Sequence, residues 1–402
     1  MATATRLLGF ALMALFVFSC QSPKIGPTDG CAADVGLTIN PDHPKAAAIQ
    51  ALLDEYTAKG LPGISVLVDD EDGTWMGSAG YADLENQIPM QPCHMCKLGS
   101  IAKLMMGTLA WQFIQAGELS LDDPIATHIP DVAADVTNGD QITVGMLLNH
   151  TAGVYDFARD LNLNLAVIND YEQVWTEEMV LDVIRNRPAT HAPGDSLSYS
   201  NSHTFLLALV IDAVAGESHR DLLRREIFER LDMENTVYYD YAEPFPRENL
   251  AQGYLDFHND GGDLQNISAL NPGNFGFTGV YSTVGDLYRF MHALMREKSL
   301  TTPENLDFIF DNMVSHEWGN WRSSFGAIHQ EQIFVLENFS DAQNVRAFGH
   351  AGGDVGYSAN LNYFPHNNTI YAAVYNYGTN LPSPLGNELS ALRAELILLM
   401  AE

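Results

Sequence analysis

The sequence predicts an α/β fold of the α+β type, in which one antiparallel sheet is made from both ends of the chain. Strand-like alternation occurs near the start of the chain, in residues 64–82, and returns after about residue 268. Segments with helical spacing fill the region between these strands. Further helical segments precede the first strands and end the chain, where they can cover a face of the sheet. A mostly helical domain is therefore inserted into a sheet domain.

The first elements are a helix and a hairpin. Asp42 to Lys59 has helical apolar spacing and stops before Gly60, and residues 64–82 alternate around the turn Asp72-Gly73. From Ser100 onward the pattern is helical, with an opening helix and then segments at residues 142–157, 177–187, 202–218 and 221–231. Strands follow at residues 276–284, 327–337, 345–353, 358–365 and 369–377, and a closing helix at 384–400. The predicted divisions are a signal peptide (1–19), a tether (20–42), the sheet domain (43–95 plus 268–402) and the helical domain (96–267).

Charge limits the partners of the protein. Fifty-one acidic residues against 20 basic ones give a formal net charge of −31. This charge repels nucleic acid and anionic lipid, and no basic stripe offsets it. We therefore expect no nucleic-acid partner, and a membrane partner only through a lipid anchor.

The N-terminus predicts export. Arg6 precedes an apolar run from Leu7 to Phe18, which is shorter than the ~20 residues that span a bilayer. The Ser19-Cys20 end resembles the cleavage box of bacterial lipoproteins, in which the cysteine becomes lipidated. The prediction is a bacterial lipoprotein, anchored through Cys20, that faces the periplasm or the cell exterior; the alternative is an ordinary secretory peptide cut nearby.

Three cysteines remain after Cys20, and their pairing is left open. They are Cys31, Cys93 and Cys96. A zinc or redox site at Cys93, His94 and Cys96 is an alternative, but no second ligand pair accompanies it. We expect no metal and no cofactor.

Ser100 and Lys103 are candidates for nucleophilic catalysis. A serine hydroxyl is a poor nucleophile until a base removes its proton. Residues three apart share one helix face, so Lys103 can reach the Ser100 hydroxyl. Desolvation can lower the pKa of a lysine enough to make it a base. The alternative is that Ser100 is only an N-cap, although a lysine three residues later does not fit a capping box.

Two later stretches add candidate residues. Tyr199 and Asn201 lie between a Pro-Gly turn and a long apolar helix, in a loop that can present side chains. His350 lies on a glycine-rich strand with Gly352 and Gly353, where a second backbone can approach closely. Taken alone, Tyr199 and His350 could equally be buried structural residues.

Together, S-x-x-K opening a helix, Y-S-N before a second helix and H-A-G on a late strand resemble the beta-lactamase-related serine hydrolases. That group includes class C beta-lactamases, D-alanyl-D-alanine carboxypeptidases and esterases. The likeness covers roughly residues 43–402, and supporting phrases occur in the family's usual order: GELSLDDPI, ITVGMLLNHTAGVYDF, PGDSLSYSN, GVYSTVGDLYRF and GHAGGDVGYSANLNYFP.

The resemblance implies a role for each matching residue. It implies that Ser100 is the acylated nucleophile, Lys103 its proton partner, and Tyr199 the general base or the leaving-group acid. Asn201 would bind the substrate amide, and His350 with Gly352 would mark the strand along which the substrate lies. The oxyanion hole would consist of the backbone N–H groups of Ser100 and Gly353. His150, in LLNHTAGV, is interpreted as structural packing.

The third motif departs from the family pattern. Ala351 stands where a serine or threonine usually follows the cationic residue, and that hydroxyl helps to hold a substrate carboxylate. Arg346 is a poor substitute, because about 13 Å separates its Cα atom from that of His350 on an extended strand. Carboxylate recognition is therefore in doubt.

Three functions remain open. The leading one is a serine hydrolase that acts through an acyl-enzyme on a small-molecule or peptide amide or ester, with D-amino-acid peptides of the cell wall as the first substrate class. An esterase or amidase without carboxylate recognition is the rival within the enzymes. A penicillin- or peptide-binding protein without turnover is the alternative from another class, and the oligomeric state is left open.

Overall fold

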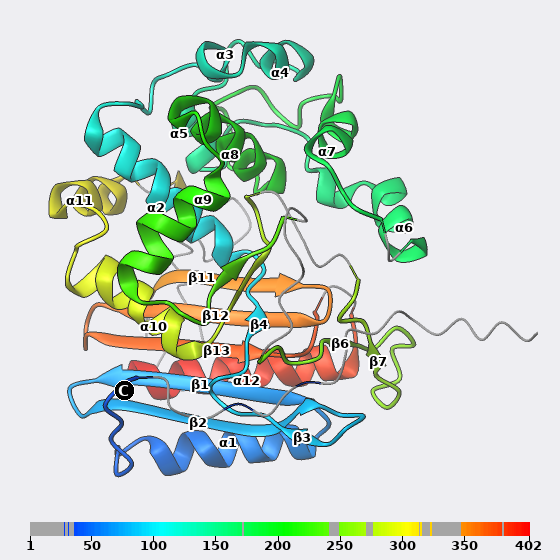
Figure 1. Cartoon of the computed structure of the whole chain (residues 1–402), viewed down its shortest axis with the longest axis vertical. Helices are drawn as coiled ribbons and strands as arrows, with labels where there is room; N and C mark the ends of the chain where they lie inside the picture. Colours follow the sequence, from blue (N-terminus) through cyan, green and yellow to red (C-terminus); the bar gives the residue numbers. More distant parts are fainter. Residues whose placement is uncertain are drawn as a thin grey trace, which may run out of the picture.

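The central element of the protein is a six-stranded sheet that combines both ends of the chain (Figure 1). The computed structural model describes residues 36–170, 173–240, 249–270, 276–312, 347–379 and 382–402, together with residues 28, 31, 314–315 and 322–323. The strands, in their order across the sheet, are β11 (Phe348–Asp354), β12 (Tyr357–Phe364), β13 (Thr369–Tyr375), β1 (Gly63–Asp70), β2 (Gly73–Asp83) and β3 (Ile88–Pro89). Each strand is antiparallel to its neighbours, and β13 pairs with β1. The α+β prediction is confirmed.

Helices cover both faces of this sheet. Helices α1 (Ala46–Ala58) and α12 (Pro384–Ala401) pack on one face, against alternate residues of β1 such as Val66. The other face, with Leu67, packs against α2 (Ile101–Ala116) and α10 (Val284–Met291). Because both faces are covered, β1 is buried along nearly its whole length.

The middle of the chain is largely helical. Its helices are α3 (Ile125–His128), α4 (Pro130–Asp135), α5 (Val144–Leu148), α6 (Leu161–Asn169), α7 (Glu177–Ile184), α8 (Asn201–Ala215) and α9 (His219–Leu223). Short 3-10 and π turns add η1 (Phe157–Arg159), η2 (Arg224–Phe228), η3 (Glu229–Leu231) and η4 (His292–Arg296). A small sheet has the order β4 (Cys96–Lys97), β8 (Val280–Ser282), β5 (Val237–Tyr238). Two further strand pairs are β6 (Tyr254–Leu255) with β7 (Gln265–Asn266), and β9 (Val314–Ser315) with β10 (Arg322–Ser323).

Two helices after residue 268 were not expected from the sequence. Helix α10 and helix α11 (Pro303–Asp311) lie in the region for which only strands and a closing helix were predicted. Helix α10 begins with a side-chain cap, in which Thr283 accepts a hydrogen bond from the backbone N–H of Asp286. Its apolar residues then recur on one face, and this face packs into the core. The strand predicted at residues 327–337 lies outside the described residues.

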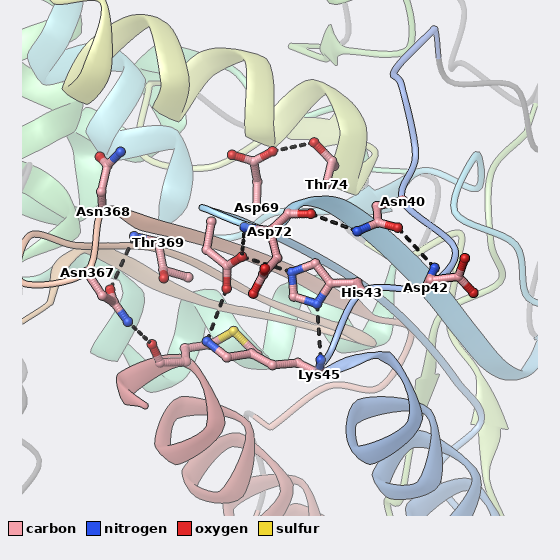
Figure 2. A network of polar contacts seen from close by, with 12 residues as sticks. Asn40, Asp42, His43, Lys45, Asp69, Asp72, Thr74, Asn367, Asn368 and Thr369 are labelled. Atoms are coloured by element: carbon pink, nitrogen blue, oxygen red, sulfur yellow. Dashed lines mark hydrogen bonds and ion pairs between the residues drawn. The ribbon is translucent and has the colours of Figure 1, made fainter.

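Polar contacts fix the turn that leads into α1 to the end of the β1–β2 hairpin (Figure 2). The side chain of Asn40 donates to the carbonyl oxygen of Asp72 at 2.7 Å. Lys45 Nζ lies 3.1 Å from Asp70 Oδ2, and His43 Nε2 lies 2.9 Å from Asp70 Oδ1. These contacts set where α1 begins relative to the strands that it covers.

The structure settles the cysteine pairing that the sequence left open. Cys31 and Cys93 form a disulfide, and Cys96 is a free, buried cysteine in β4. The pairing is incompatible with a zinc site that uses the Cys93 thiolate. Burial also raises the pKa of the Cys96 thiol. Among the described residues, no group of three or more His, Cys, Asp or Glu is placed to hold a metal ion.

Removal of the disulfide is expected to lower stability. The two cysteines are 62 residues apart, and closure of a loop of this size restricts the unfolded chain by about 4 kcal/mol in the chain-entropy model. We expect Cys31→Ser to lower the denaturant midpoint of the oxidised protein, measured by urea unfolding. The reduced wild type is the control, and it should unfold at the midpoint of the variant. Equal midpoints for the oxidised wild type and the variant would contradict this expectation.

The predicted signal peptide, the tether up to residue 27 and Cys20 lie outside the described residues. Within the part of the chain that the structure describes, none of the helices has the length and apolar character to cross a bilayer.

Candidate functional site

Ser100 lies at the start of α2, directly after a close contact between two backbone segments. Gly99 has a φ of +56°, and a Cβ atom there would lie 2.7 Å from the backbone nitrogen of Gly353. Only glycine fits this combination of left-handed backbone and close approach. The Ser100 side chain makes no capping hydrogen bond, so the interpretation of Ser100 as a side-chain N-cap is wrong. Its hydroxyl instead meets two other side chains.

Lys103 is the first of these side chains. Its Nζ atom lies 3.0 Å from Ser100 Oγ and 2.8 Å from the carbonyl oxygen of Phe277. The Lys103 side chain is fully buried. This burial lowers the pKa of Lys103 to about 7, against a smaller opposing effect of the Asp156 and Asp354 charges. A large fraction of Lys103 is therefore neutral near pH 7 and able to accept a proton.

Tyr199 is the second side chain at the Ser100 hydroxyl. The Tyr199 hydroxyl donates to Ser100 Oγ at 2.8 Å. Burial raises the pKa of Tyr199, so its phenol keeps its proton at neutral pH. These donors form one chain: Tyr199 donates to Ser100, the Ser100 hydroxyl can donate to neutral Lys103, and Lys103 donates to the Phe277 carbonyl.

Asn201 is oriented by a buried carboxylate. Asn201 is the first residue of α8. Its backbone N–H donates to Asp156 Oδ1 at 3.1 Å, and its side-chain Nδ2 donates to the same oxygen at 3.2 Å. A carboxylate only accepts hydrogen bonds, so the amide nitrogen faces Asp156. The Asn201 carbonyl oxygen is then the end that can accept an N–H from a substrate.

The glycines of β11 serve two different purposes. A Cβ atom on Gly352 would lie 1.8 Å from the carbonyl oxygen of Leu98, so Gly352 is needed for packing of the segment that leads into α2. Asp354 and Tyr357 flank the two-residue turn of the β11–β12 hairpin. Two residues that flank such a turn exchange backbone hydrogen bonds with each other. Hydrogen-bonded and non-bonded pairs alternate along the ladder, so the next residue, Gly353, does not bond to β12. Its N–H points away from β12, toward the outer edge of the sheet, where β11 is the last strand.

His350 lies beside Tyr199 as a neutral ring. The centroids of the two rings are 6.1 Å apart. The Nδ1–H of His350 donates to the carbonyl oxygen of Ala351 at 2.5 Å, which leaves Nε2 as an acceptor. Burial, followed by the Lys103 charge, lowers the pKa of His350 to about 4. His350 therefore supplies no positive charge at pH 7. Arg346, the other cation considered near this strand, lies outside the described residues.

His150 packs on Tyr199 from another side, with its ring centroid 4.5 Å away. Its backbone has a φ of +62°, a strained value for histidine. His203 Nε2 accepts from the Val154 N–H, so His203 donates from Nδ1 to Nδ1 of His150 at 3.1 Å. His150 therefore carries its proton on Nε2. This atom is buried and has no hydrogen-bond partner among the described residues.

Several residues of the site had no role in the sequence interpretation. Asp156 holds Asn201, and the Phe277 carbonyl binds Lys103. Lys97 and Asp354 form a buried ion pair at 3.1 Å. Asp156 had a usable signal, because it is an acidic residue at the end of the apolar phrase ITVGMLLNHTAGVYDF. A backbone carbonyl such as that of Phe277 has no signal in the sequence.

Ser100, Tyr199, Asn201 and Gly353 line one cavity of about 220 Å³. The hydroxyl, the amine and the phenol come from α2 and from the loop before α8, and β11 forms the adjoining edge. The site thus contains a serine with a neutral base, a proton donor, an amide acceptor and a strand edge with an outward N–H. This is the set of groups needed for acyl transfer to a serine.

Comparisons with known proteins agree with this geometry. A family model described as Beta-lactamase matches residues 48–395. The human "Serine beta-lactamase-like protein LACTB, mitochondrial" is 24% identical over 388 residues, which cover 76% of this chain and 69% of that protein. The "Beta-lactamase" of Escherichia coli K12 is 27% identical over 238 residues, which cover 59% of this chain and 57% of that protein.

Solved structures show the same architecture. A D-stereospecific amidohydrolase from Streptomyces sp. has a TM-score of 0.71 at 25% identity, and the match covers 84% of this chain and 95% of that chain. The D-amino acid amidase from Ochrobactrum anthropi SV3 with D-phenylalanine has a TM-score of 0.73 at 22% identity, over 88% of this chain and 98% of that chain. The second likeness shows the fold alone.

Proposed function

Because the chain belongs to the beta-lactamase family, we propose that it is a serine hydrolase that cleaves amides or esters through an acyl-enzyme on Ser100. The observation that carries this proposal is the pair of contacts at Ser100 Oγ, 2.8 Å from the Tyr199 hydroxyl and 3.0 Å from buried Lys103. One of these neighbours can take a proton and the other can give one.

The proposed reaction follows from these contacts. Neutral Lys103 accepts the Ser100 proton while Oγ attacks the substrate carbonyl carbon. The backbone N–H groups of Ser100 and Gly353 stabilise the oxyanion, and loss of one such donor typically costs about 3 kcal/mol in the transition state. Tyr199 donates a proton to the leaving group as the carbonyl–leaving-group bond breaks, and it recovers a proton from Lys103. Water then attacks the ester on Ser100, with the same groups acting in reverse.

Covalent labelling tests the proposal. The protein is incubated with a fluorescent fluorophosphonate and digested, and the labelled peptide is sequenced by mass spectrometry. We expect one label, on Ser100, and none in Ser100→Ala. Label on a different residue would overturn the assignment. A label that forms without multiple turnover of any amide or ester would support the binding-protein alternative.

The pH dependence of the rate reports on Lys103. Its pKa of about 7 means that the group is protonated, and cannot act as a base, in more acidic solution. We expect kcat/KM to fall about tenfold per pH unit below this pKa and to level off above it. The raised pKa of Tyr199 predicts no descending limb up to about pH 10. A rate that does not change between pH 5 and pH 8 would contradict Lys103 as the base.

His150 is expected to act through Tyr199. Asparagine tolerates positive φ but lacks the ring, so His150→Asn removes the packing on Tyr199 with little added backbone strain. We expect kcat/KM to fall roughly 10- to 100-fold, because small displacements of catalytic groups have effects of this size. In a Tyr199→Phe background the same change should add little, since the displaced hydroxyl is already absent. An equal loss in both backgrounds would show that His150 acts independently.

We further propose that the protein is exported and anchored through Cys20, as the N-terminal sequence predicts. Incorporation of labelled palmitate into the wild type and its absence from Cys20→Ala would test this. A wild type that stays unlabelled would refute the anchor.

A further inference from the structure

Building on the proposed hydrolase function, we propose that the substrate carries a bulky apolar acyl group, attached through an amide that Asn201 binds. The substrate also has an uncharged group at the position where substrates of the family carry a carboxylate. It departs from the D-amino-acid peptides first expected, which end in a free carboxylate.

The apolar part of the inference rests on the wall of the cavity at Ser100. Besides its polar groups, the cavity is lined by a set of apolar side chains from η1, α6, α7 and the segments before α7 and β8: Phe157, Leu163, Val167, Trp175, Val180 and Phe277. Phe157 and Phe277 pack edge to face with their ring centroids 4.7 Å apart, so this part of the wall is fixed before substrate binds. A preformed apolar surface beside the reacting hydroxyl favours an apolar group in that place.

The position of the wall indicates which part of the substrate it contacts. Asp156 holds Asn201, and the next residue, Phe157, belongs to the wall. A substrate amide bound to the Asn201 carbonyl oxygen lies in the cavity that Phe157 also lines, so its substituent can pack on this wall. The cavity volume is about 220 Å³, and an apolar cavity of about 150 Å³ is known to hold a benzene ring. A phenyl-sized acyl substituent thus fits.

The charges around the site carry the second part of the inference. Lys97 is bound to Asp354 at 3.1 Å, with its side chain only 2% exposed. Arg159 is paired with Asp156 at 3.5 Å and lies on the exposed side of η1. Lys103 is occupied by Ser100 and the Phe277 carbonyl. Each of these three cations is thus already engaged.

Other groups in the same region disfavour a carboxylate. Ala351 has no hydroxyl to donate, and His350 presents an acceptor nitrogen because its Nδ1–H is bound to the Ala351 carbonyl. Asp354 lines the cavity, and Asp156 lies directly behind Asn201. A substrate carboxylate would lose water here and meet the lone pair of His350, and the three cations already engaged do not offset that loss, which is how a site rejects the wrong partner.

Three matched esters test both parts. They are the phenyl ester of N-acetylglycine, the phenyl ester of N-phenylacetylglycine and the 3-carboxyphenyl ester of N-phenylacetylglycine. We expect kcat/KM to be at least tenfold higher for the second ester than for the first, and at least tenfold higher for the second than for the third. Equal values for the first two, or a faster reaction of the third, would overturn the inference.

Two variants on one helix provide a matched control. Leu163 of α6 lines the cavity, whereas Leu165 is 47% exposed on the same helix. Leu163→Ala should reduce the preference for phenylacetyl over acetyl at least threefold, and Leu165→Ala should leave it unchanged. An unchanged preference in Leu163→Ala would also overturn the inference.

Labelling of Ser100 is measured in parallel with the ester rates. A labelled Ser100 without the expected preferences refutes the substrate class and leaves the hydrolase function standing. Absence of both label and hydrolysis refutes the hydrolase function, and the substrate class with it.

Discussion

Replacement of Lys103 by methionine is expected to lower kcat/KM by about 10²- to 10⁴-fold, the usual contribution of a general base. Methionine fills a similar volume but cannot accept the Ser100 proton. The measurement is the rate of amide or ester hydrolysis at pH 8, where wild-type Lys103, with its pKa of about 7, is mostly neutral. The same change at Lys59, an exposed residue after α1 that pairs with Glu55 and Glu388, is the control and should leave the rate unchanged.

The same variant is expected to be more stable than the wild type at pH 7. The folded protein lowers the pKa of Lys103 from 10.5 to about 7, so folding at pH 7 carries a cost on the order of 4 kcal/mol for this residue. Methionine removes that cost but leaves the Phe277 carbonyl without its donor, which costs about 1–3 kcal/mol. We therefore expect a net gain of about 1–3 kcal/mol in the free energy of unfolding.

The gain should depend on pH in a defined direction. Between the folded pKa of about 7 and the ordinary value of 10.5, the unfolded wild type binds more protons than the folded one. The free energy of unfolding of the wild type therefore rises with pH across that window. The stability difference in favour of Lys103→Met becomes smaller as a result. Urea unfolding at pH 7 and near pH 10 measures the difference. A variant that is less stable than the wild type at pH 7 would contradict the burial of a neutral lysine.

Local geometry explains which parts of the site could be predicted from the sequence. Ser100 and Lys103 lie three residues apart on one helix, and that spacing alone places an amine near a hydroxyl. Tyr199 required more, because it lies 99 residues from Ser100 and its position depends on how α8 packs against α2. The order of the family motifs placed Tyr199 in the site with Ser100. The periodicity of the sequence does not predict that contact.

Other features depend on tertiary contacts that leave no local pattern. The fold class was predictable because strand alternation and helical spacing are properties of short segments. The lowered pKa of Lys103 follows from its complete burial, and the role of Asp156 follows from where α8 begins. The cysteine pairing joins residues 62 positions apart. Spacing between cysteines does not determine such a pairing.

The opposite pKa shifts of Lys103 and Tyr199 support the two proton roles proposed for these residues. A pKa of about 7 makes Lys103 a base near neutrality, whereas burial raises the pKa of Tyr199 and makes it a donor. The transferable rule is that neighbouring groups whose environments push their pKa values apart divide the acid and base work between them.

Replacement of Tyr199 by phenylalanine is therefore expected to affect substrates according to their leaving group. An amide nitrogen must be protonated as it leaves, so we expect kcat/KM for an amide to fall by about 10²- to 10⁴-fold. A p-nitrophenolate leaves without a proton, so the acylation rate with a p-nitrophenyl ester should fall much less. The measurement is the ratio of the two losses, with acylation followed as the burst of p-nitrophenol.

Tyr363→Phe is the matched control for this change. Its hydroxyl donates to Asn368 at 3.0 Å, within the turn that follows β12, and Tyr363 pairs with Phe348 at the opposite end of β11 from Gly353. Both substrates should react with Tyr363→Phe at wild-type rates. If Tyr199 were instead the base that activates Ser100, acylation by the amide and by the ester would fall equally, because both need the same nucleophile. Equal losses would therefore move the base role from Lys103 to Tyr199, and unequal losses would fix Tyr199 as the acid.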